Sequence, residues 1–352
     1  MNKITKQDLF PVFEKLAQGR VMVIGDLAID EMVYGEAARI SREAPVLILK
    51  HSNTKIILGA ASNAANNIAA LGAKKVSVLG VCGNDYHAPQ LIEAFEKSGI
   101  NTSGIVKDPN RPTSTKTRIS AASPQSVTQQ IVRIDREDNT AISDDVESHL
   151  IENMHLMAEE HDAILLSCYG IGVVTPEVIK HAKLLAKQKK LILAVDAQLD
   201  LQRFRNSTVI TPNQPEAEAS LGYKMTDFNS VKKGGWNLLN QVKLDMLLMT
   251  RGGEGMILFQ TDGTLTKIPA FNKTDVFDVT GAGDTVVGSL VLALAAGIDP
   301  KLAAVLGNLA ASIVIREFGA AVTNIETLQY TLEKLKIDYV AEYTLNKEDV
   351  NV

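Results

Sequence analysis

The sequence is poor in cysteine, in clustered basic charge and in long apolar runs, and each shortage excludes a class of protein. Its two cysteines, Cys82 and Cys168, cannot frame a disulfide scaffold or complete a zinc site alone, which favours a reducing environment. Lysine and arginine total 36 against 41 acidic residues, without a basic stripe, so nucleic-acid binding is not expected. The longest apolar stretch, 286–296, is too short for a bilayer, and the first twenty residues lack the apolar core of a signal peptide. We therefore expect a cytoplasmic protein that binds neither nucleic acid nor a membrane.

What the sequence does contain is a long alternation of two apolar patterns. Runs typical of buried strands lie at 20–25, 75–80, 163–167, 191–196, 208–211 and 244–250. Helical patterns lie at 61–71, 88–97, 143–160, 176–188 and 215–221, and two strongly apolar ones follow at 285–296 and 300–317. Strands that alternate with helices predict an α/β fold with a central, mostly parallel sheet and helices on both faces.

Two stretches, 34–57 and 103–136, interrupt this alternation because their β-branched and polar residues show little helical pattern. We predict that they form a small antiparallel β lid over one end of the main domain. No linker separates independent domains, so we expect a single domain over 1–340, with the lid inserted, and a short C-terminal tail over 341–352. The exposed strand edges of such a lid predict a homodimer formed through it.

The densest chemical signal is the segment DVTGAGDT at 278–285, directly before an apolar helix. Gly281 and Gly283 let a ligand approach the backbone closely, and the amides at a helix start favour an anion such as phosphate. Asp284 in the first turn can accept a proton from a substrate hydroxyl. A plain tight turn with Asp284 as the helix N-cap explains the same residues, and the segment alone leaves both interpretations open.

Three further segments carry polar residues at the ends of expected strands. In TPNQPE at 211–216, Asn213 and Glu216 can orient a hydrated Mg²⁺, or they can form a capping box. In TRGG at 250–253, a cation beside glycines can hold nucleotide phosphates, or the glycines can make a hairpin. Near the N-terminus, Asp26, Asp30 and the segment GAASN at 59–63 suit the hydroxyls of a sugar, although a lone aspartate after a strand is more often a turn residue.

The order of these segments resembles the ribokinase-like (PfkB) family of sugar kinases along nearly the whole chain. That resemblance implies the ribokinase-like fold and an ATP-dependent, Mg²⁺-requiring transfer of the γ-phosphate to a hydroxyl of a small sugar or sugar phosphate. Within the family, kinases that phosphorylate O1 of D-glycero-D-manno-heptose 7-phosphate are the most similar. The matching segments are RISREAPV at 39–46, NNIAALGA at 66–73, Thr115-Lys116 with Arg118, and Arg133-Ile134-Asp135.

The resemblance also implies a role for each matching residue. It implies that Asp284 is the catalytic base and that an anion hole for the γ-phosphate is formed by the amides of Gly281, Ala282 and Gly283. It places on the nucleotide side Thr250, Arg251, Gly253 and Gly255, with Asn308 near the adenine and Asn213 and Glu216 near Mg²⁺. It assigns to the sugar Asp30, Gly59, Asn63, Lys116 and Arg118. Many members also bind a monovalent cation such as K⁺, for which the matching positions are Asp278, Thr280 and Gly319. A lid that forms a dimer contact is common in the family.

The chain departs from the heptose kinases in two loops. It has Cys168 and Ile171 within SCYGIG at 167–172, where those kinases usually have S-D-Y-A-K-G, and Ala197 and Gln198 where they have D-P-K. Because two lysines are lost near the expected phosphates, these departures leave the identity of the acceptor open. One hypothesis is that the lost positive charge is replaced by Arg42, Lys116 and Arg118. The alternatives are a kinase for fructose, ribose, another sugar or adenosine, and a non-catalytic sugar or nucleotide sensor. Tyr34 is the only aromatic residue in the lid stretches, which disfavours a purine nucleoside.

Overall fold

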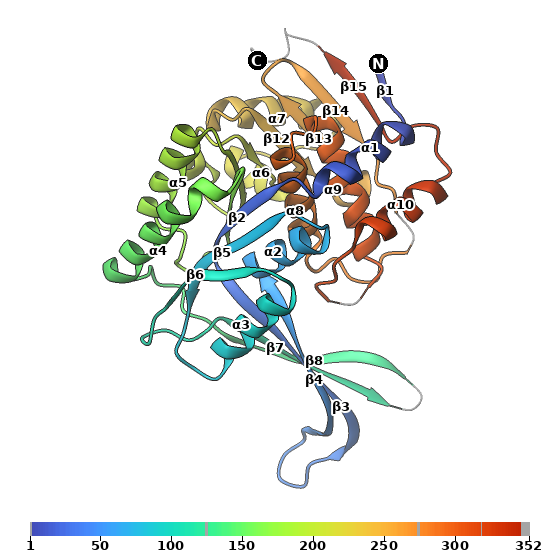
Figure 1. Cartoon of the computed structure of the whole chain (residues 1–352). Helices are drawn as coiled ribbons and strands as arrows, with labels where there is room; N and C mark the ends of the chain where they lie inside the picture. Colours follow the sequence, from blue (N-terminus) through green and yellow to red (C-terminus); the bar gives the residue numbers. More distant parts are fainter. Residues whose placement is uncertain (1, 124–125, 273–274, 318, 346–352) are drawn as a thin grey trace.

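A computed structural model describes residues 2–123, 126–272, 275–317 and 319–345 (Figure 1). An eleven-stranded sheet forms the centre of the molecule, and a separate four-stranded sheet projects from one end. Helices cover both faces of the large sheet, so the α/β prediction and the predicted lid are confirmed. Within the described residues no helix is long and apolar enough to cross a membrane.

The large sheet is parallel over most of its width. Its parallel strands, in spatial order, are β12 (Met246–Thr250), β11 (Val209–Ile210), β10 (Ile192–Ala197), β9 (Ala163–Cys168), β2 (Arg20–Gly25), β5 (Lys75–Cys82) and β6 (Asn101–Lys107). Antiparallel strands extend it beyond β12, in the order β13 (Met256–Gln260), β14 (Thr264–Ile268), β15 (Ala341–Leu345) and β1 (Asn2–Ile4). The carboxyl ends of the parallel strands therefore share one edge, where ligands bind in open α/β sheets.

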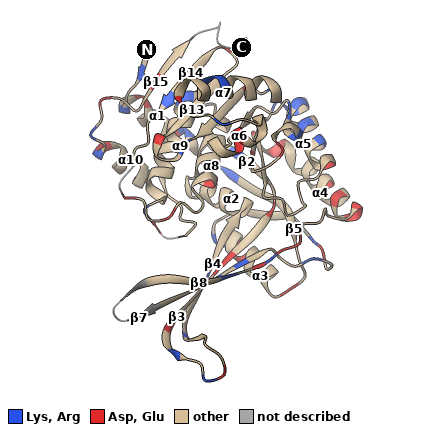
Figure 2. Cartoon of the chain, turned by 180° about the vertical axis from the view of Figure 1, so that it is seen from behind, with Lys and Arg blue, Asp and Glu red and all other residues tan. Residues whose placement is uncertain are grey.

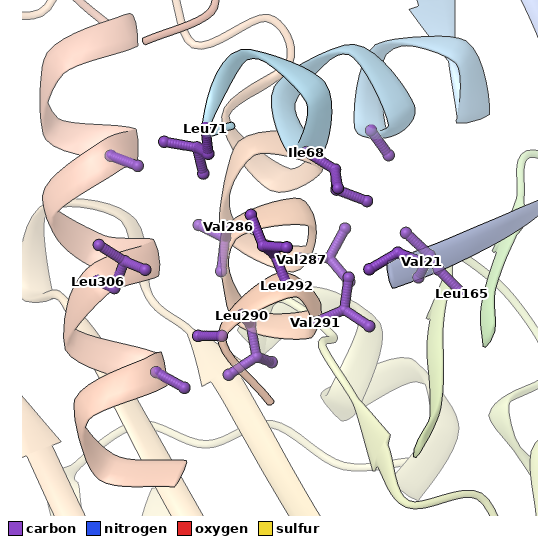
Figure 3. Close-up of a cluster of buried hydrophobic side chains, with 14 of the residues drawn as sticks. Val21, Ile68, Leu71, Leu165, Val286, Val287, Leu290, Val291, Leu292 and Leu306 are labelled. Atoms are coloured by element: carbon purple, nitrogen blue, oxygen red, sulfur yellow. The ribbon is translucent and has the colours of Figure 1, made fainter. Parts of the chain in front are cut away.

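Two apolar cores lie against this sheet. The larger core includes side chains from α1 (Lys6–Leu16), α2 (Ala61–Ala70), α3 (His87–Lys97), α8 (Ala282–Ala295), α9 (Pro300–Val314) and α10 (Ile325–Lys334). The other is formed with α4 (Asp144–Met157), α5 (Pro176–Lys189), α6 (Gln214–Leu221) and α7 (Phe228–Val242). Short 3₁₀ turns connect elements at η1 (Ala158–Glu160), η2 (Leu201–Phe204) and η3 (Gly252–Glu254). Helix α8 is apolar nearly all round because it lies between α2, α9 and the sheet (Figure 3).

The lid sheet consists of two long hairpins. Its strands are β3 (Leu27–Ile40), β4 (Leu47–Ala60), β7 (Thr115–Ser123) and β8 (Ser126–Arg136), in the order β4-β3-β7-β8. Both hairpins are antiparallel, and the central pair β3 and β7 runs parallel. The sheet begins at the rim of the large sheet and extends away from the body of the molecule (Figure 1).

The structure corrects two boundaries. Residues 101–107, part of which we had assigned to the lid, form β6 at the edge of the large sheet because they pair with β5. Ala341–Leu345, which we had assigned to a tail, form β15 between β14 and β1. The large sheet therefore includes residues up to 345, and 346–352 lie outside the described residues.

Candidate active site

Polar residues gather at the carboxyl ends of the parallel strands, close to the start of α8, and they include several of those singled out in the sequence. Asp26 follows β2, Tyr169 follows β9, and Asp196 lies near the end of β10. Asn213 follows β11 and forms an isolated bridge with Thr250 at the end of β12. This edge is where the topology places a ligand site.

Asp284 lies in the first turn of α8, and only 5% of its surface is exposed. Its Oδ2 accepts a hydrogen bond of 2.7 Å from Asn63 Nδ2, and its Oδ1 accepts one of 2.5 Å from the Tyr169 hydroxyl. The two donors come from α2 and from the loop after β9, so two separate elements fix the orientation of the carboxylate. A carboxylate held in this way can accept a proton from a neighbouring hydroxyl group.

Burial raises the pKa of the Asp284 carboxyl to about 7, and repulsion from Asp196 and Asp30 acts in the same direction. The hydrogen bonds from Tyr169 and Asn63 act in the opposite direction because they stabilise the ionised form. Burial also raises the pKa of Asp196, to about 6. A pKa near neutrality suits a general base, which must be ionised and still have affinity for a proton.

Gly281 is the residue before α8, and its φ of 78° lies in the left-handed region. A Cβ at this position would lie 2.6 Å from Asn63 Nδ2, so a side chain would disturb the amide that holds Asp284. The amide of Ala282, which we had assigned to the anion hole, donates to the Val279 carbonyl at 3.2 Å. An anion at this helix start would compete with that carbonyl for the Ala282 donor.

Asn63 is itself held by two residues that sequence analysis did not assign. Asn67 Nδ2 donates to Asn63 Oδ1 at 3.2 Å, and the Thr285 hydroxyl donates to Asn67 Oδ1 at 2.9 Å. Because these bonds occupy the oxygen of the Asn63 amide, its nitrogen faces Asp284. The spacing of Asn63 and Asn67, four residues apart on an alanine-rich helix, is a signal that could have identified the pair.

An apolar pocket of about 290 Å³ opens beside the first turn of α8. Ala282 and Gly283 lie at one end of its lining, which also includes the predicted nucleotide residues Thr250, Gly253, Gly255 and Asn308. Arg251 is not among the lining residues. Its Nε donates to Gln214 Oε1 at 3.0 Å and its guanidinium pairs with Glu254.

Asn213 and Glu216 form the capping box of α6. Glu216 N donates to Asn213 Oδ1 at 2.9 Å, and Asn213 N donates to Glu216 Oε2 at 2.8 Å. Burial and repulsion from Asp196 raise the pKa of Glu216 to about 7. Asp196 therefore interacts electrostatically with both Glu216 and Asp284. A Mg²⁺ with its waters fits beside Asp196 and Glu216 because it would relieve the repulsion between these two carboxylates.

The five residues assigned to the sugar lie on the lid side of Asp284. Asp30 is buried on β3, and Arg118 Nε donates to its Oδ1 at 3.3 Å. A Cβ on Gly59 would lie 3.0 Å from Asp30 Oδ2, so Gly59 leaves room for that carboxylate. Lys116 Nζ lies 5.6 Å from the centre of the Tyr169 ring. Of these five residues, Asn63 bonds directly to Asp284, and Asp30 acts on it electrostatically.

The three residues assigned to a monovalent cation are joined by the carboxylate of Asp278. Thr280 N donates to its Oδ1 and Gly319 N to its Oδ2, each at 2.9 Å. Burial disfavours the charge, but these hydrogen bonds outweigh it and hold the pKa of Asp278 below its usual value. An ionised carboxylate between two loops suits a cation bound beside the start of α8.

Asp26 does not face the sugar side, because its carboxylate holds the loop after β9. It accepts hydrogen bonds from the backbone amides of Tyr169, Ile171 and Val173, at 2.6, 3.2 and 3.2 Å. Ile171, which stands where the heptose kinases usually have lysine, is buried. The altered loop is therefore well anchored, and it presents Tyr169 to Asp284.

Two further residues belong to the lid hairpin of β3 and β4. Ala60, at the end of β4, has a φ of 49°, a conformation that is strained for alanine. Arg42 lies in the exposed turn between β3 and β4. From Asp30 to Ile40, β3 rises about 33 Å at the usual spacing of a strand. Arg42 is thus too far from Asp30 in its own chain to replace a lost lysine, whereas Lys116 and Arg118 are close enough.

Comparison with known sequences identifies a family. The model of the pfkB family carbohydrate kinases matches residues 18–328. The bifunctional protein HldE of Geobacter metallireducens is 42% identical over 301 residues, which are 85% of this chain and 60% of that protein. HldE of Helicobacter hepaticus is 38% identical over 313 residues, or 88% of this chain and 63% of that protein. The chain thus spans less than two thirds of the length of these relatives.

Comparison with solved structures shows the same fold. Phosphofructokinase-2 from Escherichia coli, in complex with substrates and products, superposes with a TM-score of 0.72 at 17% identity, covering 91% of this chain and 100% of that one. Ribokinase from Arabidopsis thaliana, complexed with ribose and ATP, superposes with a TM-score of 0.68 at 17% identity, and the match covers 90% of this chain and 99% of that one. With the family match over residues 18–328, the chain belongs to the pfkB family of carbohydrate kinases and is a phosphotransferase.

Proposed function

We propose that this kinase transfers the γ-phosphate of ATP to O1 of a heptose 7-phosphate in the cytoplasm. The observation that carries the transfer reaction is the buried carboxylate of Asp284 at the start of α8, beside an apolar pocket on one side and the lid residues on the other. The similarity to HldE, with identities of 34–42%, supports heptose phosphate as the acceptor. The alternative is the same reaction with another sugar, a sugar phosphate or a nucleoside.

In this reaction Asp284 accepts the proton of the acceptor hydroxyl. The freed oxygen forms a bond to the γ-phosphorus, and the bond from that phosphorus to the β–γ bridging oxygen breaks, so ADP leaves. The start of α8, with Gly281, Ala282 and Gly283, presents its amides and its dipole toward the negative charge. The protein forms no covalent intermediate, and its contribution is geometry and charge placement.

On the nucleotide side, the pocket beside α8 takes the adenine and ribose, with Asn308 and the glycines at 253 and 255 in its lining. Asn213, Glu216 and Asp196 would hold Mg²⁺ through water, and Asp278, Thr280 and Gly319 would hold K⁺. When bound, Mg²⁺ neutralises charge on the β- and γ-phosphates.

Two cations on the lid bear on the chemical class of the acceptor. Lys116 and Arg118 lie two residues apart on β7, so their side chains leave the same face of that strand. Arg118 reaches Asp30, and Lys116 reaches the ring of Tyr169. A phosphorylated sugar that binds Asp30 with its hydroxyls therefore meets two cations beside it, which favours a sugar phosphate over an uncharged sugar.

We predict that Asp284→Asn lowers kcat by roughly 10²–10⁴-fold, because the amide cannot accept the proton of the acceptor hydroxyl. Nucleotide affinity, measured by calorimetry, should change little, since the pocket is formed by other residues. The matched control is Glu326→Gln, an exposed acid-to-amide change on α10, which should leave kcat unchanged. A near-native kcat for Asp284→Asn would refute the assignment of the base.

We also predict that ADP release from Mg-ATP is fastest with heptose 7-phosphate in a panel that includes fructose, fructose phosphates, ribose and adenosine. Replacing Lys116 and Arg118 together by alanine should raise the KM for the phosphorylated acceptor about tenfold or more, because a charge-assisted contact is lost. The control Lys50→Ala removes an exposed cation from the outer part of β4. Turnover confined to an unphosphorylated acceptor would contradict the assignment of heptose 7-phosphate as the acceptor, whereas the assignment of a kinase would still hold.

We infer that the lid forms a homodimer. No charged residue occurs from 119 to 132, and the outer part of the hairpin of β7 and β8 is correspondingly free of blue and red in Figure 2. Apolar side chains on β8 are exposed, with 44% of Val132 and 53% of Ile134 accessible. Both β4 and β8 are edge strands of the lid. Unpaired edges and exposed apolar residues together favour association with a second copy.

The double variant Val132→Glu and Ile134→Glu is predicted to weaken dimerisation about 100-fold or more, because it places two carboxylates in an apolar contact. Analytical ultracentrifugation over a concentration series measures this. Leu156→Glu, which changes an exposed leucine on α4, serves as the control and should leave the dimer intact. A monomeric wild-type mass at micromolar concentration would disprove the lid dimer.

A further inference from the structure

The Tyr169 hydroxyl is one of two side-chain groups that donate a hydrogen bond to Asp284 within the described residues. The bond to Oδ1 is 2.5 Å, against 2.7 Å for the bond from Asn63 to Oδ2. Asp284 is deeply buried, so hydrogen bonds that stabilise its charge replace water that it has lost. Because the Asn63 bond serves one oxygen alone, the other oxygen depends on Tyr169.

The position of Tyr169 is fixed by its own loop. Its backbone amide donates to Asp26 Oδ2 at 2.6 Å, and the amides of Ile171 and Val173 bond to the same carboxylate. Asp26 is 1% exposed, so this anchor lies inside the protein. The hydroxyl therefore reaches Asp284 from a loop that has little freedom to withdraw.

We propose that Tyr169 is a positioning residue, whose hydroxyl keeps the Asp284 carboxylate ionised and oriented toward the acceptor hydroxyl. This proposal rests on the function proposed above. The hydroxyl acts through Asp284 and takes no proton itself, since the pKa of the phenol is raised well above its usual value by burial and by the neighbouring carboxylates. The ring also lies near Lys116, so it connects the base with the part of the lid assigned to the sugar.

Several charged groups surround Asp284, and they determine what loss of the hydroxyl does. Asp196 on β10 and Asp30 on β3 disfavour its ionisation, and Arg118 offsets the charge of Asp30. Lys116 Nζ lies over the Tyr169 ring, 5.6 Å from its centre. With Tyr169→Phe, these repulsions and the burial remain while one stabilising hydrogen bond disappears, so the pKa of Asp284 should rise above its wild-type value of about 7.

The first test reads the carboxyl group directly and does not depend on turnover. The protein is labelled with ¹³C at the aspartate carboxyl carbons, and the Asp284 signal is assigned by its loss in Asp284→Asn. Its titration midpoint should lie about one pH unit higher in Tyr169→Phe than in the wild type. The control Tyr223→Phe removes a hydroxyl that bonds only to Asn237 in the described structure, and its midpoint should equal that of the wild type.

The second test is kinetic. If the midpoint rises by one unit, kcat of Tyr169→Phe at pH 7 should be about fivefold below the wild type, and the difference should shrink as the pH rises. An unchanged Asp284 midpoint in Tyr169→Phe, or a loss of kcat that is equal at every pH, would overturn the proposal. A failure of the proposed function would give a different result. The wild type would then transfer no phosphate, while the Asp284 titration midpoints of the wild type and of Tyr169→Phe would still differ.

Discussion

The burial of one carboxylate at the first turn of α8 is the constraint on which the site depends. Water is largely removed from Asp284, so its charge must be supported by the protein. Two hydrogen bonds supply that support, and two neighbouring acids oppose it. The balance leaves a group that is near its titration point at neutral pH, which is the condition for accepting and releasing a proton.

The fold produces this balance by bringing distant parts of the sequence together. Asn63 comes from α2, Tyr169 from the loop after β9, and Asp196 from β10, while the helix that carries Asp284 is buried between α2, α9 and the sheet (Figure 3). The apolar packing of α8 therefore fixes the base, and Gly281 keeps the backbone close enough for Asn63 to reach it. Stability and chemistry depend on the same contacts here.

Much of this arrangement could be predicted from the sequence. Apolar periodicity located six of the seven parallel strands within a residue or two, and the residues of DVTGAGDT, TPNQPE and TRGG do converge at one edge of the sheet. Periodicity could not show that β6 joins the large sheet or that β15 closes its far side, because strand partners are chosen by tertiary packing. The lid was located from its pattern, but the parallel pairing of its two hairpins was not.

Side-chain roles were harder to predict than elements. The sequence made Asp26 a candidate ligand for a sugar, whereas in the structure its carboxylate anchors the loop after β9. Asn213 and Glu216 form the capping box that was the alternative to a metal site. Tyr169 gave no clear signal, because its importance comes from the groups that the fold places beside it.

The dependence of kcat/KM on pH tests the central claim most directly, because it reports the ionisation of the base in the free enzyme. Ionised Asp284 is the active form, so kcat/KM for the wild type should rise with pH through a midpoint near 7 and then reach a plateau. The acceptor used should have no group that titrates near pH 7, or the effect of its titration on kcat/KM should be subtracted. A profile that stays flat from pH 5 to 9 would contradict the assignment of this buried carboxylate as the base.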